Sequence, residues 1–254
     1  MINIIAMGYN WTFERFLEKS EYSKDIRILH VFLPKNRKEK LNETISICEK
    51  MGLKWSIPEN KNRLIEEIKE IDNSTKIDLG VVCAYMMVLP PELLQIPRYG
   101  FINLHLSLLP KHRGAHPVNW AIIQGDEYTG CTVHYMTEEV DKGNIIVQEK
   151  LNIGNHDIVY LTRQLADIGS DLIFKALALF EKEKPPAGWP QNESEATMDP
   201  PRKPEDGEIK QGCSAFEAMR LIRALKRPWP GAFVRDRGKK IVIYGRELLP
   251  LSGD

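Results

Sequence analysis

The sequence predicts an α/β protein with a doubly wound, mostly parallel sheet and a small C-terminal β appendage. Two observations predict this class. Short apolar runs alternate with stretches of helical periodicity through the first hundred residues, which is the pattern of repeated strand–helix–strand units. The run at residues 78–84, D-L-G-V-V-C-A, is almost wholly apolar, as expected for a parallel strand that is covered on both faces.

The first half of the chain shows these units one after another. An apolar strand at residues 2–7 ends at Gly8, and residues 11–19 then carry large apolar side chains at helical spacing. A second strand, at residues 26–33, ends at Pro34. Further elements are expected at 41–51 (helix), 55–58 (strand), 61–71 (amphipathic helix), 78–84 (strand) and 90–94 (short helix). This order of elements predicts a Rossmann-like architecture.

The second half begins with a strand at residues 101–105. The elements expected after it are a helix at 118–124, strands at 130–135 and 145–149, a long helix from 157 to 179, an irregular polar tract from 184 to 207, a helix at 214–225 and a strand at 241–244. Prolines at residues 184–190 break the long helix. We therefore divide the chain into a first domain, residues 1–184, and a linker, helix and small β subdomain, residues 185–254.

Composition and charge argue against several classes of protein. Lys plus Arg and Asp plus Glu both number 35 in 254 residues, so the formal net charge is zero, and no global field draws the protein to nucleic acid or to a membrane surface. The four cysteines are scattered without a C-x-x-C pair, which indicates buried thiols in a reducing compartment. No apolar run has the length of a signal peptide or a membrane span. We expect a soluble cytoplasmic protein.

Polar groups gather where the strand at residues 101–105 ends. Asn103 and His105 are two residues apart, and because side chains alternate along a strand, both leave the same face. The carboxyl ends of strands are where ligands bind in α/β proteins. No G-x-G-x-x-G follows the first strand, so the sequence does not predict a nicotinamide cofactor, and no H-x-x-H pair or cysteine cluster predicts a metal.

Two motifs carry a resemblance to a known family. N-L-H-L-S-L-L-P-K-H-R-G begins at Asn103, and G-C-T-V-H-Y-M-T-E-E-V-D-K-G begins at Gly130. Together they resemble the signature of the N10-formyltetrahydrofolate-dependent formyltransferases. Four further stretches are similar to the branch that holds the nucleotide-sugar N-formyltransferases and methionyl-tRNA formyltransferase: residues 117–125 (P-V-N-W-A-I-I-Q-G), 193–197 (E-S-E-A-T), 202–209 (R-K-P-E-D-G-E-I) and 227–233 (R-P-W-P-G-A-F). The match covers most of the chain in the right order.

The resemblance implies roles for particular residues. Family members use an Asn, a His and an Asp in catalysis, and these fall on Asn103, His105 and Asp141. The co-substrate N10-formyltetrahydrofolate is expected to be held by three loops, made of Met87, Val88 and Leu89, of Ser107, Leu108, Leu109 and Pro110, and of Thr137, Glu138, Glu139 and Val140. Asn10, Trp11 and His116 stand where they could contact the acceptor substrate. No metal is required.

These residue types suit the transfer of a formyl group from a folate nitrogen to an amine. The carbonyl oxygen gains negative charge during transfer, and the amide of Asn103 can donate to it without reorientation. The attacking amine must lose a proton. His105 can take that proton, since an imidazole has an unperturbed pKa of about 6.5, or it can stabilise the oxyanion in its charged form. Asp141 would orient the ring and favour its protonated form.

The acceptor amine is expected on a dTDP- or UDP-linked amino deoxysugar. The tRNA-directed enzymes carry a larger C-terminal barrel and a basic loop, whereas the stretch after Val234 is short and the chain is neutral, so we expect no nucleic-acid partner. The alternatives are methionyl-tRNA formyltransferase, a formyltetrahydrofolate-binding or hydrolysing protein and, with a poorer fit, glycinamide ribonucleotide formyltransferase. The basic run at residues 35–40 could contact a phosphate, but a solvated helix start is the better interpretation. Short strands in the tail could pair between protomers, so a homodimer stays open.

Other conspicuous side chains have simpler interpretations. We expect His134, which alternates within a strand, to be structural, and Arg113 to anchor the loop after the strand at residues 101–105 through its several donors. Trp120 and Trp229 are interpreted as core or domain-interface residues. His112 lies in the same loop and could touch substrate.

Overall fold

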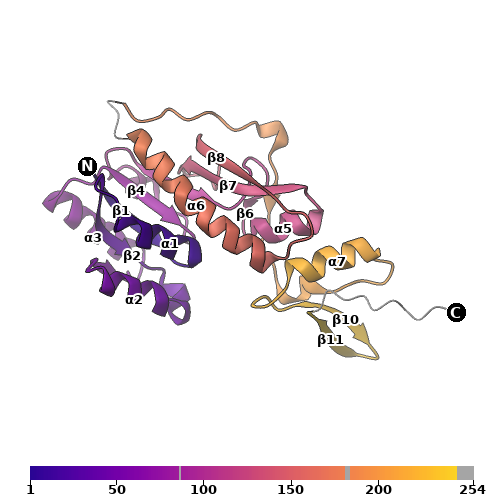
Figure 1. The fold of residues 1–254 in the computed structure, drawn as a ribbon. Helices are drawn as coiled ribbons and strands as arrows, with labels where there is room; N and C mark the ends of the chain where they lie inside the picture. The colour runs from indigo at the N-terminus through magenta and orange to yellow at the C-terminus, as the bar shows by residue number, and fades with distance from the viewer. Residues whose placement is uncertain (86, 181–183, 245–254) are drawn as a thin grey trace.

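The computed structural model describes residues 1–85, 87–180 and 184–244, and its centre is a seven-stranded sheet (Figure 1). The strands of this sheet are β1 (Ile2–Gly8), β2 (Ile26–Phe32), β3 (Trp55–Ser56), β4 (Leu79–Cys83), β5 (Phe101–His105), β7 (Tyr128–Tyr135) and β8 (Ile145–Asn152). All seven strands were predicted, with ends that differ by a few residues.

The strand order is β3-β2-β1-β4-β5-β7-β8. The five strands from β3 to β5 pair in parallel, and β7 pairs antiparallel with both β5 and β8. Chain order reverses at β1 and β4, where a doubly wound sheet opens a crevice beyond its carboxyl ends. The predicted mostly parallel, Rossmann-like sheet is confirmed, and β5 ends beside this crevice.

Helices cover both faces of the sheet because alternate residues of its strands are apolar on each side. Ile4 and Ala6 of β1 belong to the core under α1 (Trp11–Ser20), α2 (Asn42–Lys50), α5 (Pro117–Gln124) and α6 (Ile158–Phe180). Ile5 and Met7 face the other core, under α3 (Lys61–Ser74) and α4 (Pro91–Leu94). The long α6 runs across the front of the sheet beside α1 (Figure 1).

The C-terminal part forms a small unit beyond α5 (Figure 1). Helix α7 (Ala215–Ala224) begins with a capping box, in which Ser214 and Glu217 bond each other's backbone N–H, and it packs on α5. Strands β10 (Ala232–Asp236) and β11 (Lys239–Ile243) form an antiparallel hairpin. The predicted small β appendage is therefore confirmed.

One expectation was wrong in part, because the tract after α6 is not irregular throughout. Strand β9 (Met198–Asp199) pairs in parallel with β6 (Arg113–Gly114), and short 3₁₀ helices form at η2 (Glu193–Glu195) and η3 (Pro204–Gly207). We call residues 189–200 the strap, since they run along the loops that follow β5 and β7. A two-residue pairing leaves no periodic pattern in a sequence, so it could not be predicted.

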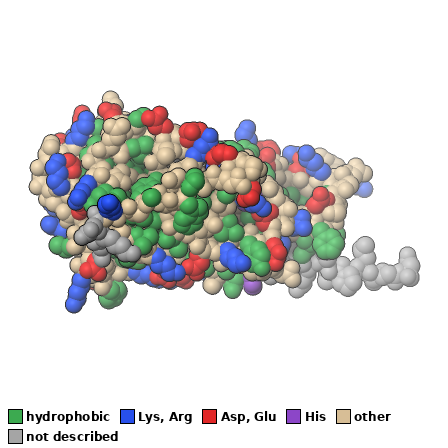
Figure 2. Space-filling model, turned by 90° about the horizontal axis from the view of Figure 1, so that it is seen from above, with side chains coloured by type: hydrophobic (Ala, Val, Ile, Leu, Met, Phe, Trp, Pro, Cys, Tyr) green, Lys and Arg blue, Asp and Glu red, His purple; other side chains and the backbone are tan. Residues whose placement is uncertain are grey.

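The surface is mixed in character. Figure 2 shows Lys and Arg side chains interspersed with Asp and Glu over one face. The basic run forms the 3₁₀ helix η1 (Lys35–Lys40), whose side chains are mostly exposed. Within the part of the chain that the structure covers, no helix has the length and apolar character needed to cross a membrane. Cys48, Cys83 and Cys131 are buried free thiols, and Cys213 is half-buried.

Candidate active site

The candidate site begins at the carboxyl end of β5, where Asn103 and His105 leave the same face of the strand. His105 is buried and Asn103 is half-buried. The antiparallel register of β5 and β7 places Asn103 opposite His134 and His105 opposite Thr132. The polar side chains of two neighbouring strands therefore meet at one end of the sheet.

Asp141 reaches this strand end from the loop between β7 and β8. Its Oδ2 lies 3.5 Å from Nδ1 of His105, and its Oδ1 lies 3.5 Å from Nε2 of His134. Oδ2 also accepts a hydrogen bond of 2.8 Å from the backbone N–H of Gly114. Asp141 has a φ of 55°, a left-handed conformation that Asp tolerates better than most residues. The amide, the imidazole and the carboxylate expected to act together are thus brought together.

The environment of Asp141 favours its charged form. Burial alone would raise the pKa of this carboxyl. The interactions with His105 and His134 and the bond from Gly114 outweigh burial and hold the pKa of Asp141 well below its ordinary value. The site therefore keeps a carboxylate beside the His105 ring at neutral pH.

The second ring nitrogen of His105 is engaged as well. Its Nε2 lies 2.7 Å from the backbone carbonyl oxygen of His112. A carbonyl oxygen only accepts, so Nε2 carries hydrogen and donates, which assigns the tautomer. Nδ1 is then the nitrogen that can gain or lose a proton, and it faces Asp141.

His134, which was expected to be structural, contacts two of the candidate site residues. Its Nε2 lies 3.2 Å from Nδ2 of Asn103, and its Nδ1 donates to the carbonyl of Tyr135 at 2.8 Å. In the neutral ring Nε2 is therefore an acceptor for one N–H of Asn103. This bond orients the Asn103 amide so that the second N–H of its NH2 group stays available. The contact between His134 and Asn103 follows from the β5–β7 register, which cannot be read from the sequence.

His112 is also placed differently from the expectation that it could touch substrate. Its ring is buried, with Nδ1 at 2.6 Å from Oδ2 of Asp199 and Nε2 at 3.0 Å from Oδ2 of Asp126. Both ring nitrogens are therefore occupied by carboxylates, and the side chain faces inward rather than toward a substrate.

The S-L-L-P loop is held in place by hydrogen bonds from β7 and β8. Thr132 donates to the carbonyl of Ser107 at 2.7 Å and accepts from the N–H of Leu109 at 3.3 Å. Gln148 donates to the carbonyl of Leu109 at 2.9 Å. Ser107 and Leu109 are buried, while Leu108 and Pro110 are partly exposed. The loop is a fixed edge of the crevice.

A shallow hollow lies beside the acidic loop. It has a volume of about 610 Å³ and is lined by Thr137, Glu138, Glu139, Lys142 and Glu193. Three of the five lining residues belong to the loop expected to hold the folate. Gln191 of the strap donates to the carbonyls of Asp141 and Gly143, at 2.7 and 2.9 Å, and so fixes the loop that carries the carboxylate.

The remaining predicted contact residues follow the carboxyl ends of β4 and β1. Met87, Val88 and Leu89 follow β4, with Leu89 buried and Val88 exposed. Asn10 follows β1 and uses its side-chain oxygen to cap α1, at 3.1 Å from the N–H of Thr12. Trp11 is exposed, with Arg163 over its ring. The contact roles of these residues remain predictions.

The loop after β5 is anchored as expected. The guanidinium of Arg113 is almost fully buried and forms four hydrogen bonds, two to Gln191 and two to Glu193. His116 caps α5 with a φ of 59°, and its ring packs edge-on against Trp229 at 4.9 Å between centroids. Trp120 is half-buried and contacts the C-terminal segment: its Nε1 donates to the Pro200 carbonyl at 3.1 Å, and the guanidinium of Arg202 lies 4.8 Å from its ring centroid, which agrees with the domain-interface alternative.

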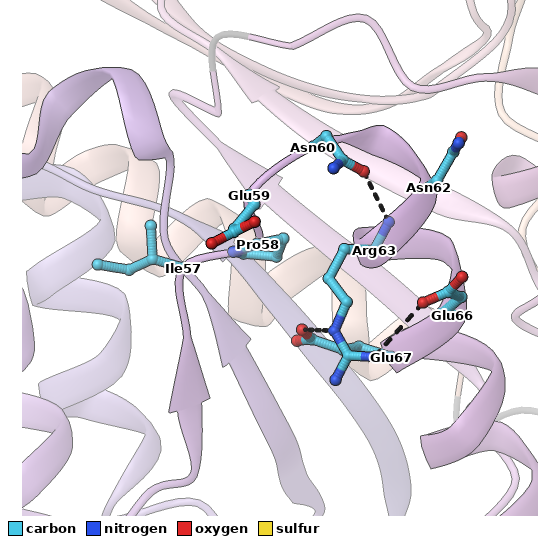
Figure 3. A pocket seen from close by; sticks show the side chains of 8 residues that line it. All are labelled: Ile57, Pro58, Glu59, Asn60, Asn62, Arg63, Glu66 and Glu67. Carbon is cyan, nitrogen blue, oxygen red and sulfur yellow. Dashed lines mark hydrogen bonds and ion pairs between the residues drawn. The ribbon is translucent and has the colours of Figure 1, made fainter.

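A second hollow, of about 470 Å³, lies at the other end of the sheet, where β3 is followed by α3 (Figure 3). Arg63, which lines this hollow, is paired with Glu66 and Glu67 (Figure 3). Three strands separate β3 from β5 in the sheet order, so this hollow is not part of the site around His105. Among the described residues, no group of three or more His, Cys, Asp or Glu side chains could hold a metal ion.

Comparison with known proteins identifies both parts of the chain. Residues 16–177 match the family model described as formyl transferase, and residues 202–254 match that of the formyl transferase C-terminal domain. The methionyl-tRNA formyltransferase of Alkaliphilus oremlandii is 39% identical over 215 residues, which cover 83% of this chain and 68% of that protein. The methionyl-tRNA formyltransferase of Caldicellulosiruptor saccharolyticus is 32% identical over 243 residues, which cover 94% of this chain and 76% of that protein.

Solved structures share the fold. A 4-N formyltransferase from Francisella tularensis aligns with a TM-score of 0.75 at 22% identity, covering 95% of this chain and 96% of that chain. A sugar N-formyltransferase from Shewanella sp FDAARGOS_354 aligns with a TM-score of 0.73 at 19% identity, covering 96% of both chains. At these identities the likeness establishes the fold alone.

A Rossmann-like sheet with an amide, an imidazole and a carboxylate converging at one strand end suits an enzyme that transfers a chemical group. The chain belongs to the formyltransferase family, and it is an N-formyltransferase. This family uses N10-formyltetrahydrofolate as its co-substrate. The catalytic roles of Asn103, His105 and Asp141 remain predictions.

Proposed function

We propose that this enzyme transfers the formyl group of N10-formyltetrahydrofolate to the amino group of a nucleotide-linked amino deoxysugar. The observation that carries the transfer chemistry is the convergence of three groups at the end of β5. Asp141 contacts His105 and His134, and His134 in turn contacts Asn103. When bound, the folate supplies the formyl carbon that the acceptor amine attacks.

Asn103 stabilises the charge that develops during transfer. One N–H of its Nδ2 is occupied by His134. The second N–H is free to donate to the carbonyl oxygen of the formyl group as that oxygen becomes negative. Because His134 has already oriented the amide, the donor needs no rearrangement at the moment of reaction.

His105 and Asp141 handle the proton of the attacking amine. The amine must lose one proton as its bond to the formyl carbon forms, and the folate nitrogen must gain one as its own bond breaks. Nδ1 of His105 is the exchangeable ring position, since Nε2 is held by the His112 carbonyl. The Asp141 carboxylate, 3.5 Å from Nδ1, stabilises the ring while it carries the extra proton.

The S-L-L-P loop and the acidic loop are the expected binding site of the folate. The S-L-L-P loop and the acidic loop are both fixed by hydrogen bonds, and the hollow of about 610 Å³ opens beside the acidic loop. Thr137, Glu138 and Glu139 line this hollow. These loops offer backbone groups and a rigid wall to a flat heterocycle, without reorganisation on binding.

The acceptor's phosphates have candidate partners around His116. The Nε–H groups of Arg37 and Arg202 are buried, and neither has a hydrogen-bond partner within the described part of the chain. Burial first, and then the charges of Arg202 and Arg37, lower the pKa of His116. The backbone N–H of Arg202 donates to His116 at 3.2 Å. Phosphate oxygens are acceptors of the kind that these two buried donors lack.

The balanced surface charge favours a small acceptor over a polyanion. The formal net charge is zero, and charges of both signs are interspersed over the face in Figure 2. A tRNA is bound mainly through many phosphate contacts, which need an extended basic surface. A nucleoside diphosphate needs only one or two cationic contacts.

Formylation of methionyl-tRNA is the second candidate, and a specific observation favours it. Relatives that are 32% and 39% identical to this chain are named methionyl-tRNA formyltransferases. The basic helix η1 also exposes Lys35, Lys38 and Lys40, which could contact a phosphate backbone.

Direct assay of both acceptor classes decides between them. The purified protein is incubated with N10-formyltetrahydrofolate and either a panel of dTDP- and UDP-linked amino sugars or initiator methionyl-tRNA, and formylated products are measured by mass spectrometry. The His105→Ala variant serves as the chemical blank. Formylation of an amino sugar supports the proposal, and formylation of the tRNA alone replaces it with the second candidate. Formate release at the same rate with and without any amine would show hydrolysis instead of transfer.

A further inference from the structure

His112 has surroundings that the transfer chemistry does not explain. Its buried ring lies between two carboxylates, with Nδ1 at 2.6 Å from Asp199 and Nε2 at 3.0 Å from Asp126. Each ring nitrogen is thus within hydrogen-bond distance of a carboxylate oxygen. Asp199 belongs to β9 of the strap, and Asp126 follows α5. One ring therefore ties the loop after β5 to two distant segments of the chain.

The backbone carbonyl of His112 faces the candidate site, and its N–H faces the strap. Its N–H donates to Oγ1 of Thr197 at 2.7 Å, and its carbonyl accepts from Nε2 of His105 at 2.7 Å. His112 also has a φ of 59°, in the left-handed region that a non-glycine residue adopts rarely and only when its surroundings hold it there. The contacts of the ring and of the N–H hold this conformation, which aims the carbonyl at His105.

The strap fixes the other half of the site as well. Gln191 bonds the carbonyls of Asp141 and Gly143, and it accepts from the guanidinium of Arg113. Both partners of the His105 ring, the carbonyl at Nε2 and the carboxylate at Nδ1, are therefore positioned by contacts to residues of the strap.

We propose that His112 is a positioning residue for His105. With its ring clamped by Asp126 and Asp199, its carbonyl holds hydrogen on Nε2 of His105 and leaves Nδ1 as the nitrogen that exchanges protons beside Asp141. This inference rests on the catalytic role proposed for His105.

We call the contacts of Asp126 and Asp199 with the His112 ring the clamp. The titratable groups around the rings of His105 and His112 show how the clamp can affect the tautomer of His105. Asp141 faces His105 directly, and His134 faces the other oxygen of Asp141. Asp126 and Asp199 face His112. If the His112 carbonyl moves, Nε2 of His105 loses its acceptor. The neutral ring can then carry its hydrogen on Nδ1, which donates it to Asp141. In that tautomer Nδ1 has no free lone pair with which to accept a proton from the amine.

A matched pair of variants tests this clamp without backbone strain. His112→Gly and His112→Asn both tolerate the positive φ, but only Asn keeps a donor at the position of Nδ1 for Asp199. Glu195→Ala, at an exposed position of the strap, is the control for general disturbance of this segment. Far-UV circular dichroism and thermal unfolding establish that each variant is folded.

The first measurement is the ¹⁵N NMR spectrum of the His105 ring, which reports the tautomer without any substrate. Wild-type protein and His112→Asn are expected to show hydrogen on Nε2 in the neutral ring, and His112→Gly is expected to show a mixture. Hydrogen on Nδ1 in the neutral wild-type ring would overturn the proposal. This measurement stays informative even if the catalytic role of His105 fails in the activity assay.

The second measurement is formyl transfer to whichever acceptor of the panel is used by the wild type. The kcat of His112→Gly should fall by about 10- to 100-fold, as for a misplacement of about 1 Å, with the KM for N10-formyltetrahydrofolate unchanged and the pH profile of kcat shifted. His112→Asn should recover most of kcat. If His112→Gly does not fold, Asp199→Asn, which removes the charge at nearly constant volume, takes its place and should change tautomer and kcat in the same direction. A folded variant without the clamp that keeps the wild-type tautomer, kcat and pH profile would refute the inference.

Discussion

Replacing Asn103 by Ala separates the chemistry of this enzyme from its stability. The variant removes the amide that we place at the formyl oxygen and leaves the strand otherwise unchanged. Loss of one preorganised donor to an oxyanion costs about 2.7–4 kcal/mol in the transition state, equivalent to about 10²–10³-fold in kcat. We expect Asn103→Ala to lose turnover by this factor.

The effect on folding should be much smaller. Asn103 is half-buried, and within the described ranges its side chain forms one hydrogen bond, at 3.2 Å to His134. Loss of a neutral hydrogen bond of this kind costs about 1 kcal/mol. His134 keeps its bond to the Tyr135 carbonyl and its contact with Asp141, so its ring stays in place.

The assay compares three quantities in the wild type, in Asn103→Ala and in a matched control. Asn62→Ala is the control, since Asn62 is an exposed residue of α3 at the far end of the sheet. Urea denaturation gives the free energy of unfolding, calorimetric titration gives the affinity for the folate, and single-turnover formyl transfer gives the chemical rate. A folded Asn103→Ala protein with a rate within about threefold of the wild type would refute the proposed role of this amide, because the expected loss is at least thirtyfold larger.

Three further outcomes are expected. The depressed pKa of Asp141 means that its carboxylate stabilises the fold above the unfolded pKa of about 4, and that this stability is lost as the pH falls further. Asp141→Asn should therefore lower the unfolding free energy by about 1–3 kcal/mol at pH 7, with the difference closing below about pH 4 in urea titrations; a difference independent of pH would contradict this. Arg202→Ala should raise the KM for a nucleotide-linked acceptor by about tenfold or more and leave that for the folate unchanged, whereas an equal rise in both would argue against a phosphate contact. In Gly143→Ala the new Cβ would lie 1.8 Å from the carbonyl oxygen of Tyr135, so we expect a loss of about 1–3 kcal/mol in thermal unfolding, and an unchanged midpoint would show that the loop yields easily.

Much of the fold could be predicted because local pattern determines it. The apolar run before Gly8, the almost wholly apolar β4 and the amphipathic α3 each bury a face that the sequence displays directly. The shared direction of Asn103 and His105 followed in the same way, from the two-residue period of a strand.

The remaining parts of the site depend on which distant segments meet, and periodicity does not contain that information. The sequence predicts which face of its strand His134 lies on, but not which side chain it meets, and His134 was therefore interpreted as structural. The antiparallel register of β5 and β7 brings it to Asn103. The approach of Asp141 to His105 was expected from family resemblance alone. The strap was missed because its pairing with β6 is two residues long and lies among prolines and polar residues.

The strap also determines where this enzyme can be divided or recombined. A fragment that ended with α6 would contain Asn103, His105 and Asp141, yet it would lack Gln191, which bonds the Asp141 carbonyl, and Thr197 and Asp199, which bond His112 beside His105. A chimera that exchanges acceptor-binding segments between relatives should therefore place its junction after Asp199. Cutting earlier would separate the catalytic side chains from the scaffold that aligns them.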